Sequence, residues 1–400
     1  MSSPAGGIRR QVSTDELDSP LLSYDEAMVR IVGAFTPLPP VRRQLSDALG
    51  LVLAADVIAG DDIPAFDNSA MDGYAVRSLD VVVPGVELAV ADVAAPGTVT
   101  KVMTGQPIPE GCDAVVPWEH TESLGADRVR ITGVVEPGRF VRPQGEDVRS
   151  GDLVLAAGTM LGPVEIGMAA ALGSAELLVH PRPRVGVLST GDELVGVDEP
   201  VGRGRVRDAN GPLLAATVTA LGAEVAAVER VPDDPDLIAA ALHRLAAVAD
   251  LVVTSGGASV GEKDWLRVLL EREGTLMFWR IAMRPGKPVA LGRVDDTPVV
   301  VLPGNPGSVV ACSHVVLGRA LRCLAGAPTE PRTVAALLAE DITGDARRTV
   351  VHPVRLRSGV AVPAQVRSSQ VLSNALGLDG WVIVAPGGVT AGSTVQVEAT

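Results

Sequence analysis

Cysteine is scarce in this chain of 400 residues, which contains only Cys112, Cys312 and Cys323. The three positions are scattered, and no two of them form a C-x-x-C pair. An odd, dispersed set supports neither a disulfide framework nor a zinc ribbon. We therefore expect a protein with reduced thiols, located in the cytoplasm.

Long hydrophobic runs are also missing. The uninterrupted apolar segments 51–55 and 299–302 are much shorter than the roughly 20 residues that a membrane helix needs. The first residues, MSSPAGGIRRQVSTDELDSP, include basic side chains but no apolar stretch after them, unlike a secretory signal. The sequence predicts no membrane segment.

Positive charge and aromatic side chains are both in short supply. There are 34 Lys and Arg against 48 Asp and Glu, a formal net charge of -14. This balance argues against nucleic acid and anionic membranes as partners, but a local basic pocket for an anionic small molecule stays compatible with it. Aromatic residues make up 2% of the chain, so the cores must be built from Val, Leu, Ile and Ala. The 43 Gly and 30 Pro favour α/β and β architecture over helical bundles.

The composition and the hydrophobic pattern of the chain change at several points, and each change predicts a domain boundary. Residues 1–20, rich in Ser, Pro, Gly and charge, are expected to form a flexible tail. Segments 21–59 and 141–183 predict an N-terminal helical and extended domain, with a compact β domain inserted at 60–140. Residues 184–327 predict an α/β domain, and residues 328–400 a small C-terminal β domain. The predicted fold class is α/β plus β, in several domains.

Alternating patterns in the α/β segment predict a doubly wound sheet, whose ligands bind at the carboxyl ends of the strands. The expected strands are 185–189, 224–228, 251–254, 277–281, 289–291 and 299–302, and the expected helices are 212–221, 235–248, 264–271 and 308–324. Elsewhere we expect one helix capped by Ser23 and ended by Pro37, and another at 164–172. Further strands are expected at 73–76, 86–93, 98–103, 114–118 and 128–135, then at 334–338, 349–356, 360–364, 381–385 and 394–397.

Each central strand of this sheet is followed by a loop of glycine with small hydroxyl or acidic residues. The loop with Ser255, Gly256, Gly257 and Ser259 lets backbone amides approach an anion, and the helix that follows it has an N-terminus that favours phosphate. It matches neither GxxxxGK[ST] nor GxGxxG, so the patterns of common nucleoside triphosphatases and nicotinamide enzymes are absent. The alternative is that glycine merely allows tight connections between strands and helices.

Carboxylates and cations flank these loops. Asp192, Glu193, Asp233 and Asp264 lie near strand ends or helix starts and are candidate magnesium ligands, because that ion prefers oxygen and often bridges substrate phosphates. The alternative for Asp233 and Asp264 is a helix cap. The turn Arg284-Pro-Gly-Lys-Pro288 places two cations where an oxyanion or phosphate fits, with a solvated turn as the alternative.

The strings FDNSAMDGYAVR, MTGQPIPEGCDAVV, RPQGEDVRSGD, VLSTGDEL, VRDANGPLL, SGGASVGEKD, RPGKPVALG and VLPGNPGSVV follow one another as in the molybdopterin molybdenumtransferase family. The resemblance covers residues 21–397 and extends to gephyrin E-type domains. It implies an enzyme that inserts molybdate at the dithiolene sulfurs of adenylylated molybdopterin and releases AMP with the help of Mg2+. It also implies a homodimer whose active cleft is shared between the α/β domain of one subunit and the β domain of the other, and contact with the molybdopterin adenylyltransferase.

The resemblance assigns roles to particular residues. Functional acids and hydroxyls by this match are Asp67, Thr104, Glu193, Asp233 and Asp264. Of these, Asp233 and Asp264 would be the main magnesium ligands with Glu193 nearby, and Asp67 and Thr104 would come from the partner subunit. The implied substrate-binding residues are Ser255, Gly256, Gly257, Ser259, Arg284, Lys287, Pro303, Asn305, Pro306, Ser308 and Ser369.

Some positions depart from the family pattern, and two other functions compete. Ala209, Ala258, Trp265 and Gly307 stand where Ser, Val, Tyr and Val are common, and residues 351–353 replace an aromatic-plus-Arg pattern. One competing function is the adenylyltransferase, whose fold resembles residues 184–326 but which lacks the FDNSAMDGY domain. The other is a scaffold that keeps the fold and binds a partner's peptide.

Overall fold

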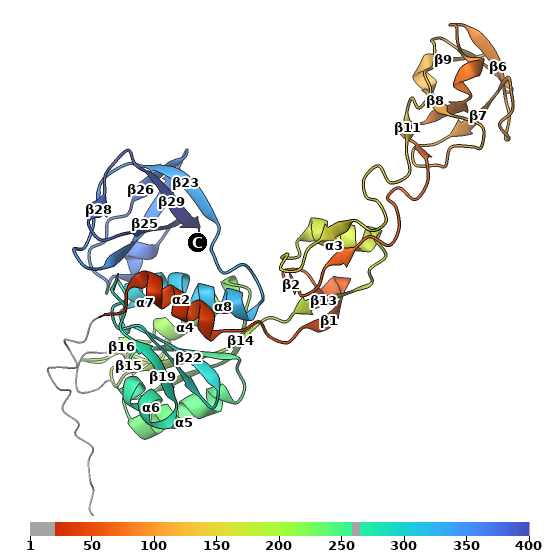
Figure 1. The fold of residues 1–400 in the computed structure, drawn as a ribbon. Coiled ribbons are helices and arrows are strands. Elements are labelled where there is room, and N and C mark those ends of the chain that lie inside the picture. Colours follow the sequence, from red (N-terminus) through yellow and green to blue (C-terminus); the bar gives the residue numbers. More distant parts are fainter. Residues whose placement is uncertain (1–20, 258–264, 400) are drawn as a thin grey trace, which may run out of the picture. The chain divides into compact units, whose positions relative to one another are not determined.

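The computed structural model describes residues 21–257 and 265–399, which fall into two compact units (Figure 1). Within the described residues, the first unit contains 21–41, 50–52 and 179–399. The second contains Arg42–Leu49 and Leu53–Leu178.

A six-stranded sheet with helices on both faces forms the centre of the first unit. Its strands, in spatial order, are β17 (Glu224–Val231), β14 (Arg184–Thr190), β18 (Leu251–Ser255), β22 (Thr297–Leu302), β21 (Ala290–Val294) and β19 (Thr275–Trp279). The first four strands run parallel, and β21 and β19 are antiparallel to their neighbours. Every residue of β18 is buried, as expected for a central strand covered on both faces. The doubly wound α/β prediction is confirmed, with an antiparallel edge that the periodicity did not reveal.

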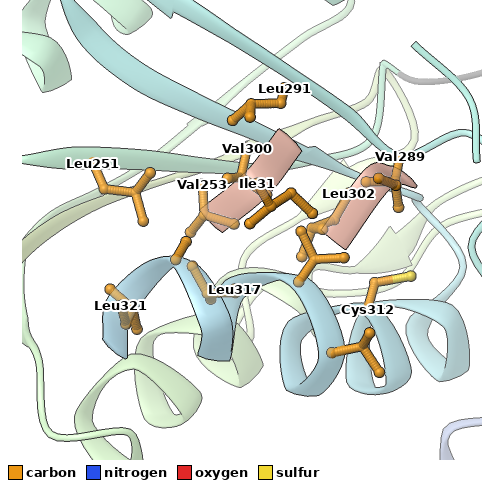
Figure 2. Packing of buried hydrophobic residues seen from close by; sticks show 14 of the residues in the cluster. Ile31, Leu251, Val253, Val289, Leu291, Val300, Leu302, Cys312, Leu317 and Leu321 are labelled. Carbon is orange, nitrogen blue, oxygen red and sulfur yellow. The ribbon is translucent and has the colours of Figure 1, made fainter. Parts of the chain in front are cut away.

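Two groups of helices cover this sheet. The first group packs in the larger core and consists of α2 (Tyr24–Ala34), α4 (Asn210–Ala220), and the continuous run of α7 (Pro306–Cys312), the π-helical η4 (Ser313–Leu317) and α8 (Gly318–Leu324). The second consists of α5 (Pro235–Ala246) and α6 (Trp265–Glu273). Figure 2 shows Ile31 of α2 close to the strand residues Val253, Val300 and Leu302, with Leu317 facing the same cluster. As predicted, Ser23 caps α2, its side chain accepting a hydrogen bond from Glu26 N at 3.2 Å.

The helical run Pro306–Leu324 is the one candidate membrane span among the described residues. With 19 residues and a mean hydropathy of 1.2, this run is long and apolar enough to cross a membrane. The sequence analysis did not identify it, because polar residues interrupt its apolar stretches. However, 78% of the apolar window is buried inside the protein. This run is the core helix of an α/β domain.

The C-terminal strands of the first unit close into a small barrel. The order is β20-β25-β26-β23-β29-β27, and an additional pairing of β25 with β27 closes the ring. The bounds are β20 (Met283–Arg284), β23 (Thr333–Leu338), β25 (Thr349–Arg357), β26 (Val360–Pro363), β27 (Gly380–Val384) and β29 (Thr394–Ala399). The strand β20 runs parallel to β25 and places Arg284 opposite Val350. This pairing brings the RPGKP turn against the barrel.

The second unit contains a six-stranded β sheet and one helix. The sheet order is β8-β5-β7-β6-β10-β9, with β5 (Gly73–Val76), β6 (Val86–Val90), β7 (Thr98–Val102), β8 (Ala114–Pro117), β9 (Thr121–Ser123) and β10 (Arg128–Ile131). The helix is α3 (Pro163–Ala171). The strands β6 and β10 end before residues 93 and 135, where we had expected them to end, because the chain bends beyond each strand.

Short strands and 3-10 turns complete the two units. The strands are β1 (Val41–Gln44), β2 (Val52–Leu53), β3 (Val57–Ile58), β4 (Asn68–Ser69), β11 (Val141–Arg142), β12 (Leu153–Leu155), β13 (Glu176–His180), β15 (Leu194–Val195), β16 (Val206–Arg207), β24 (Ile342–Thr343) and β28 (Gly388–Val389). The 3-10 turns are η1 (Leu45–Asp47), η2 (Ser78–Asp80), η3 (Trp118–His120) and η5 (Leu372–Ala375).

Candidate functional site

The loops that follow β14, β18 and β22 meet at one cavity of about 490 Å³, called here the strand-end cavity. It is lined by Ser189, Thr190, Gly191, Glu193, Leu194, Asp208, Asn210, Asp233, Ser255, Gly256, Gly257, Lys287, Pro288, Pro303, Gly304 and Asn305. The carboxyl ends of neighbouring parallel strands lie at one edge of a sheet, which is why loops distant in sequence converge there. The cavity therefore gathers most of the α/β residues that we expected to bind substrate.

Glycine is required at the start of the loop after β18. Gly256 has φ +94, and a Cβ at this position would lie 2.3 Å from the carbonyl oxygen of Thr190. Gly257 has φ +64, and a Cβ there would lie 2.9 Å from Leu266 Cδ1. Both conformations favour glycine, and both bring the backbone close to the cavity. The predicted amide approach to an anion is compatible with this geometry, although Ser259 lies outside the described residues.

Asn210, the first residue of α4, joins two of the cavity loops. Its Nδ2 group donates hydrogen bonds to Ser255 Oγ and to the carbonyl oxygen of Gly304, both at 2.8 Å. Ser255 Oγ in turn donates to the carbonyl oxygen of Pro303 at 3.3 Å. Sequence reasoning missed Asn210, whose signal was its place in the string VRDANGPLL.

Several buried oxygens at this cavity have no hydrogen-bond partner among the described residues. They are Ser189 Oγ, Thr190 Oγ1 and Asn210 Oδ1. An unpaired buried polar atom costs about 1–3 kcal/mol, so a native protein normally supplies it with a partner. These atoms are suited to meet a polar ligand or ordered water.

Three carboxylates line the strand-end cavity: Glu193, Asp208 and Asp233. Asp208 is buried, and its Oδ1 accepts a hydrogen bond from Gly211 N at 2.9 Å, which ties it to the start of α4. The backbone N–H of Asp233 donates to Asp192 Oδ1 at 3.1 Å. Asp192 itself does not line the cavity.

The helix-cap alternative for Asp233 is wrong. The N-cap of α5 is Asp234, whose Oδ1 accepts hydrogen bonds from Asp236 N and Leu237 N, both at 3.0 Å. The cap lies one position further along because Pro235 begins the helix. Asp264, the other candidate magnesium ligand, lies outside the described residues. Among the residues that are described, no group of three His, Cys, Asp or Glu side chains is arranged to hold a metal ion.

A second cavity, called here the basic cavity, adjoins the first and also measures about 490 Å³. The two share Lys287, Pro288, Pro303 and Asn305. The cations of the basic cavity are Arg284, Lys287, Arg348 and Arg367, and its described lining contains no Asp or Glu. The remaining lining residues are Met283, Pro285, Gly286, Gly307, Ser308, Val351, Pro353, Val366, Ser368, Ser369, Asn374, Ala375, Leu378 and Trp381.

The remaining predicted site residues of the first unit lie at or beside the basic cavity. Arg284, Ser308 and Ser369 line the basic cavity, as predicted substrate-binding residues. Arg348 and Arg367 also line it, and the sequence analysis did not predict either of them. Pro306 begins α7 and lines neither cavity. The short motifs carried no signal for the missed arginines, because both lie in the divergent C-terminal segment.

Asp67 and Thr104 belong to the second unit. The Oδ1 atom of Asp67 accepts a hydrogen bond from Gln144 N at 2.7 Å. Thr104 donates through its backbone N–H and its hydroxyl to Asp72 Oδ1, at 2.7 and 2.8 Å, and these bonds lower the pKa of Asp72. Local hydrogen bonds therefore hold both predicted residues in defined positions.

Comparison with known proteins identifies the family. One family model, the MoeA N-terminal region (domain I and II), matches residues 22–173, and another, the probable molybdopterin binding domain, matches residues 186–323. Molybdopterin molybdenumtransferase 2 of Mycobacterium tuberculosis is 42% identical over 309 residues, covering 72% of this chain and 76% of the relative. The chain belongs to the molybdopterin molybdenumtransferase family. A further relative, the molybdopterin molybdenumtransferase of Haemophilus influenzae, is 37% identical over 302 residues, 72% of this chain and 74% of its own.

Solved structures of the molybdenumtransferase family have the same fold. The crystal structure of molybdopterin biosynthesis MoeA protein from Pyrococcus horikoshii OT3 matches with a TM-score of 0.77 and 28% sequence identity, covering 95% of this chain and 100% of that one. These comparisons confirm the predicted fold class and the family resemblance. They also confirm the predicted enzyme class, a transferase of molybdenum cofactor biosynthesis.

Proposed function

We propose that this protein inserts molybdate into adenylylated molybdopterin, with release of AMP that depends on Mg2+. The observation that carries the proposal is the pairing of two adjoining cavities of opposite character. The strand-end cavity combines a glycine loop with carboxylates, and the basic cavity has cations and no carboxylate in its described lining. Lys287 lines both, so one substrate can reach from the first into the second.

The strand-end cavity suits the phosphoanhydride of the adenylylated pterin. Backbone amides at Gly256 and Gly257 supply neutral donors to phosphate oxygens, and glycine is the residue that allows this close approach. Asn210 fixes the loop by its hydrogen bonds to Ser255 and Gly304. By covering the bound phosphates, these loops would exclude water from them and so strengthen the electrostatic interactions within the cavity.

The oxygen donors of this cavity fit a magnesium ion that keeps water and substrate phosphates as its other ligands. Glu193 and Asp233 would hold the ion, with Asp264 as the expected third carboxylate. Mg2+ binds oxygen and is usually held by one or two carboxylates rather than by an all-protein cage, so two carboxylates at the cavity suffice. When bound, the ion neutralises charge that develops on the phosphates as AMP leaves.

The basic cavity suits molybdate, a tetrahedral oxyanion. Arg284 and Lys287 present cationic donors, and Ser308 and Ser369 add polar side chains to the lining. Holding the oxyanion beside the pterin converts an encounter between two substrates into a reaction within one complex. The protein's main contribution to metal insertion is then the positioning of two anions that would repel each other in water.

The remaining features of the proposal concern assembly. We propose a homodimer in which Asp67 and Thr104 of one subunit complete the site of the other, as the family resemblance implies. A contact with the molybdopterin adenylyltransferase would hand over the adenylylated pterin directly. A cytoplasmic location follows from the scarcity of cysteine and stays a prediction.

AMP release is the experiment that tests this function. The purified chain is incubated with adenylylated molybdopterin in the presence and absence of Mg2+ and molybdate, and AMP is measured by chromatography. We expect release only when both are present. Asp233→Asn should slow it by at least about tenfold, and Asp234→Asn, a matched control that keeps the α5 cap, should not. AMP release at the same rate with and without molybdate would contradict the proposal. Binding of adenylylated molybdopterin without AMP release would favour a scaffold function.

A further inference from the structure

The cations of the basic cavity are concentrated beyond what the chain as a whole would suggest. The protein carries a formal net charge of -14, yet four cationic side chains and no described acid line this cavity. Burial lowers the pKa of Lys287, and the nearby charges of Arg280 and Arg348 lower it further. Like charges gathered in this way are stabilised by an anion. Two of the four cations, Arg348 and Arg367, lie in the C-terminal part of the chain and belong to none of the family strings.

Arg348 is held in a fixed position. The parallel pairing of β20 with β25 sets Arg284 opposite Val350, and so brings Arg348 to the RPGKP turn. The Nε and Nη2 groups of Arg348 donate to Asp345 Oδ2 at 3.0 and 2.6 Å. The hydrogen bond from Arg348 lowers the pKa of Asp345 to about 2, so this carboxylate stays ionised at neutral pH. Among the described residues Nη1 has no partner, and it remains available to a ligand.

Arg367 lies in the segment 364–371, which packs against the start of α7. Asn305 Nδ2 donates to Ser369 Oγ at 3.3 Å across this contact. A Cβ on Gly307 would lie 2.8 Å from the carbonyl oxygen of Ser369 and 3.4 Å from that of Val371. The valine that is common at position 307 would therefore push this segment away. No described residue forms an ion pair or a hydrogen bond with the side chain of Arg367.

Two departures from the family pattern thus have a common explanation. Residues 351–353 lack the arginine often found there, and Gly307 replaces a valine. Arg348 lies three residues before Val351, at the cavity. The segment that carries Arg367 occupies the space that the missing side chain of Gly307 leaves. The cavity therefore has four cationic side chains although residues 351–353 supply none of them.

We propose that Arg348 and Arg367 bind the oxyanion together with Arg284 and Lys287, and that Gly307 is required because it admits the segment that carries Arg367. This inference rests on the proposed function, in which the oxyanion is molybdate. It adds two binding residues and one residue that positions them.

Calorimetric titration of the full chain with sodium molybdate tests the inference. Arg348→Gln, Arg367→Gln and Gly307→Val should each raise Kd by about tenfold, the usual effect of losing one charge-assisted hydrogen bond at a site open to solvent. Arg357→Gln removes one cation from the exposed end of β25, outside the cavity, and should leave Kd unchanged.

The outcomes separate this inference from the proposed function. If Arg284→Gln abolishes binding while Arg348→Gln and Arg367→Gln bind like the unaltered chain, the inference is overturned and the proposed function stands. If the unaltered chain does not bind molybdate, the proposed function fails, and the inference fails with it. Should Gly307→Val destabilise the fold, Arg367→Gln decides the question, because Arg367 is exposed and its replacement disturbs no described contact.

Discussion

A buried ion pair between the C-terminal barrel and the long helix offers a sharp test of the packing. Glu398 of β29 and Arg319 of α8 are 7% and 5% exposed, and Arg319 Nη2 lies 3.1 Å from Glu398 Oε1. His314 Nε2 lies 3.2 Å from the other oxygen, Oε2. The same Arg319 lies 3.9 Å from Glu330, whose side chain is 82% exposed. One arginine therefore has a buried and an exposed acidic partner.

Replacing each acid with glutamine should have very different effects. Glu398→Gln leaves the Arg319 charge buried without its counter-ion, which typically costs about 3–5 kcal/mol. Glu330→Gln removes an exposed pair, worth roughly 0–1 kcal/mol. At the low estimate of about 3 kcal/mol, Glu398→Gln should lower Tm by roughly 6–12 °C for a unit of this size. Thermal unfolding at pH 7, followed by tryptophan fluorescence, measures both, since Trp381 stacks on His314 with ring centroids 6.0 Å apart.

The pH dependence gives an independent check on the same variant. Burial would raise the pKa of Glu398, but the hydrogen bond from His314 and the charge of Arg319 outweigh it and hold the pKa below its ordinary value. A carboxyl with a lowered folded pKa stabilises the protein above its unfolded pKa, and this stability is lost as the pH falls through the folded pKa. The Tm difference from the unaltered chain should therefore shrink below about pH 4. Equal Tm losses for both variants, or a difference that grows in acid, would refute this reasoning.

Two further predictions concern the strand-end cavity and an exposed histidine. Gly256→Ala, whose Cβ would collide with the carbonyl oxygen of Thr190, should weaken binding of the adenylylated pterin by more than about tenfold. Gly202→Ala, whose Cβ would meet no atom within 4 Å and which lies outside both cavities, should bind normally in the same titration. The hydrogen bond that His243 Nδ1 donates to the Asp295 carboxylate raises the pKa of His243. The stability that this bond contributes is therefore present below the unfolded pKa and is lost as the pH rises through the folded pKa. Replacement of His243 by Gln should thus lower Tm at pH 6 and leave it unchanged at pH 9; a loss at pH 9 alone would be inconsistent with this sign.

Hydrophobic periodicity and the positions of Pro, Gly and capping residues predicted most of the fold. Helix α5 and strand β18 begin where their patterns begin, because Pro235 starts the helix and a run of apolar residues fills the buried strand. The patterns did not show that β21 runs antiparallel to both of its neighbours, β22 and β19. Strand direction depends on the connection and on packing across the sheet, and neither leaves a period in the sequence.

The candidate site was predictable only where a glycine loop or a family motif string includes the residue. Gly256 falls in such a loop, and its positive φ explains why. Asn210 and Arg348 are single polar residues without a period, and their roles arise from pairings between segments far apart in the chain. The cap of α5 shows the same limit at short range, since Asp233 and Asp234 are adjacent and only local geometry decides which one caps.

Reconstitution of a molybdoenzyme that lacks its cofactor tests the central claim most directly. The chain is supplied with adenylylated molybdopterin, Mg2+ and molybdate, and the activity recovered by the acceptor enzyme is compared with the AMP released. Insertion of molybdate predicts that the two rise together, one AMP for each active acceptor. AMP release without any recovered activity would contradict the claim and would indicate a transferase with a different metal or product.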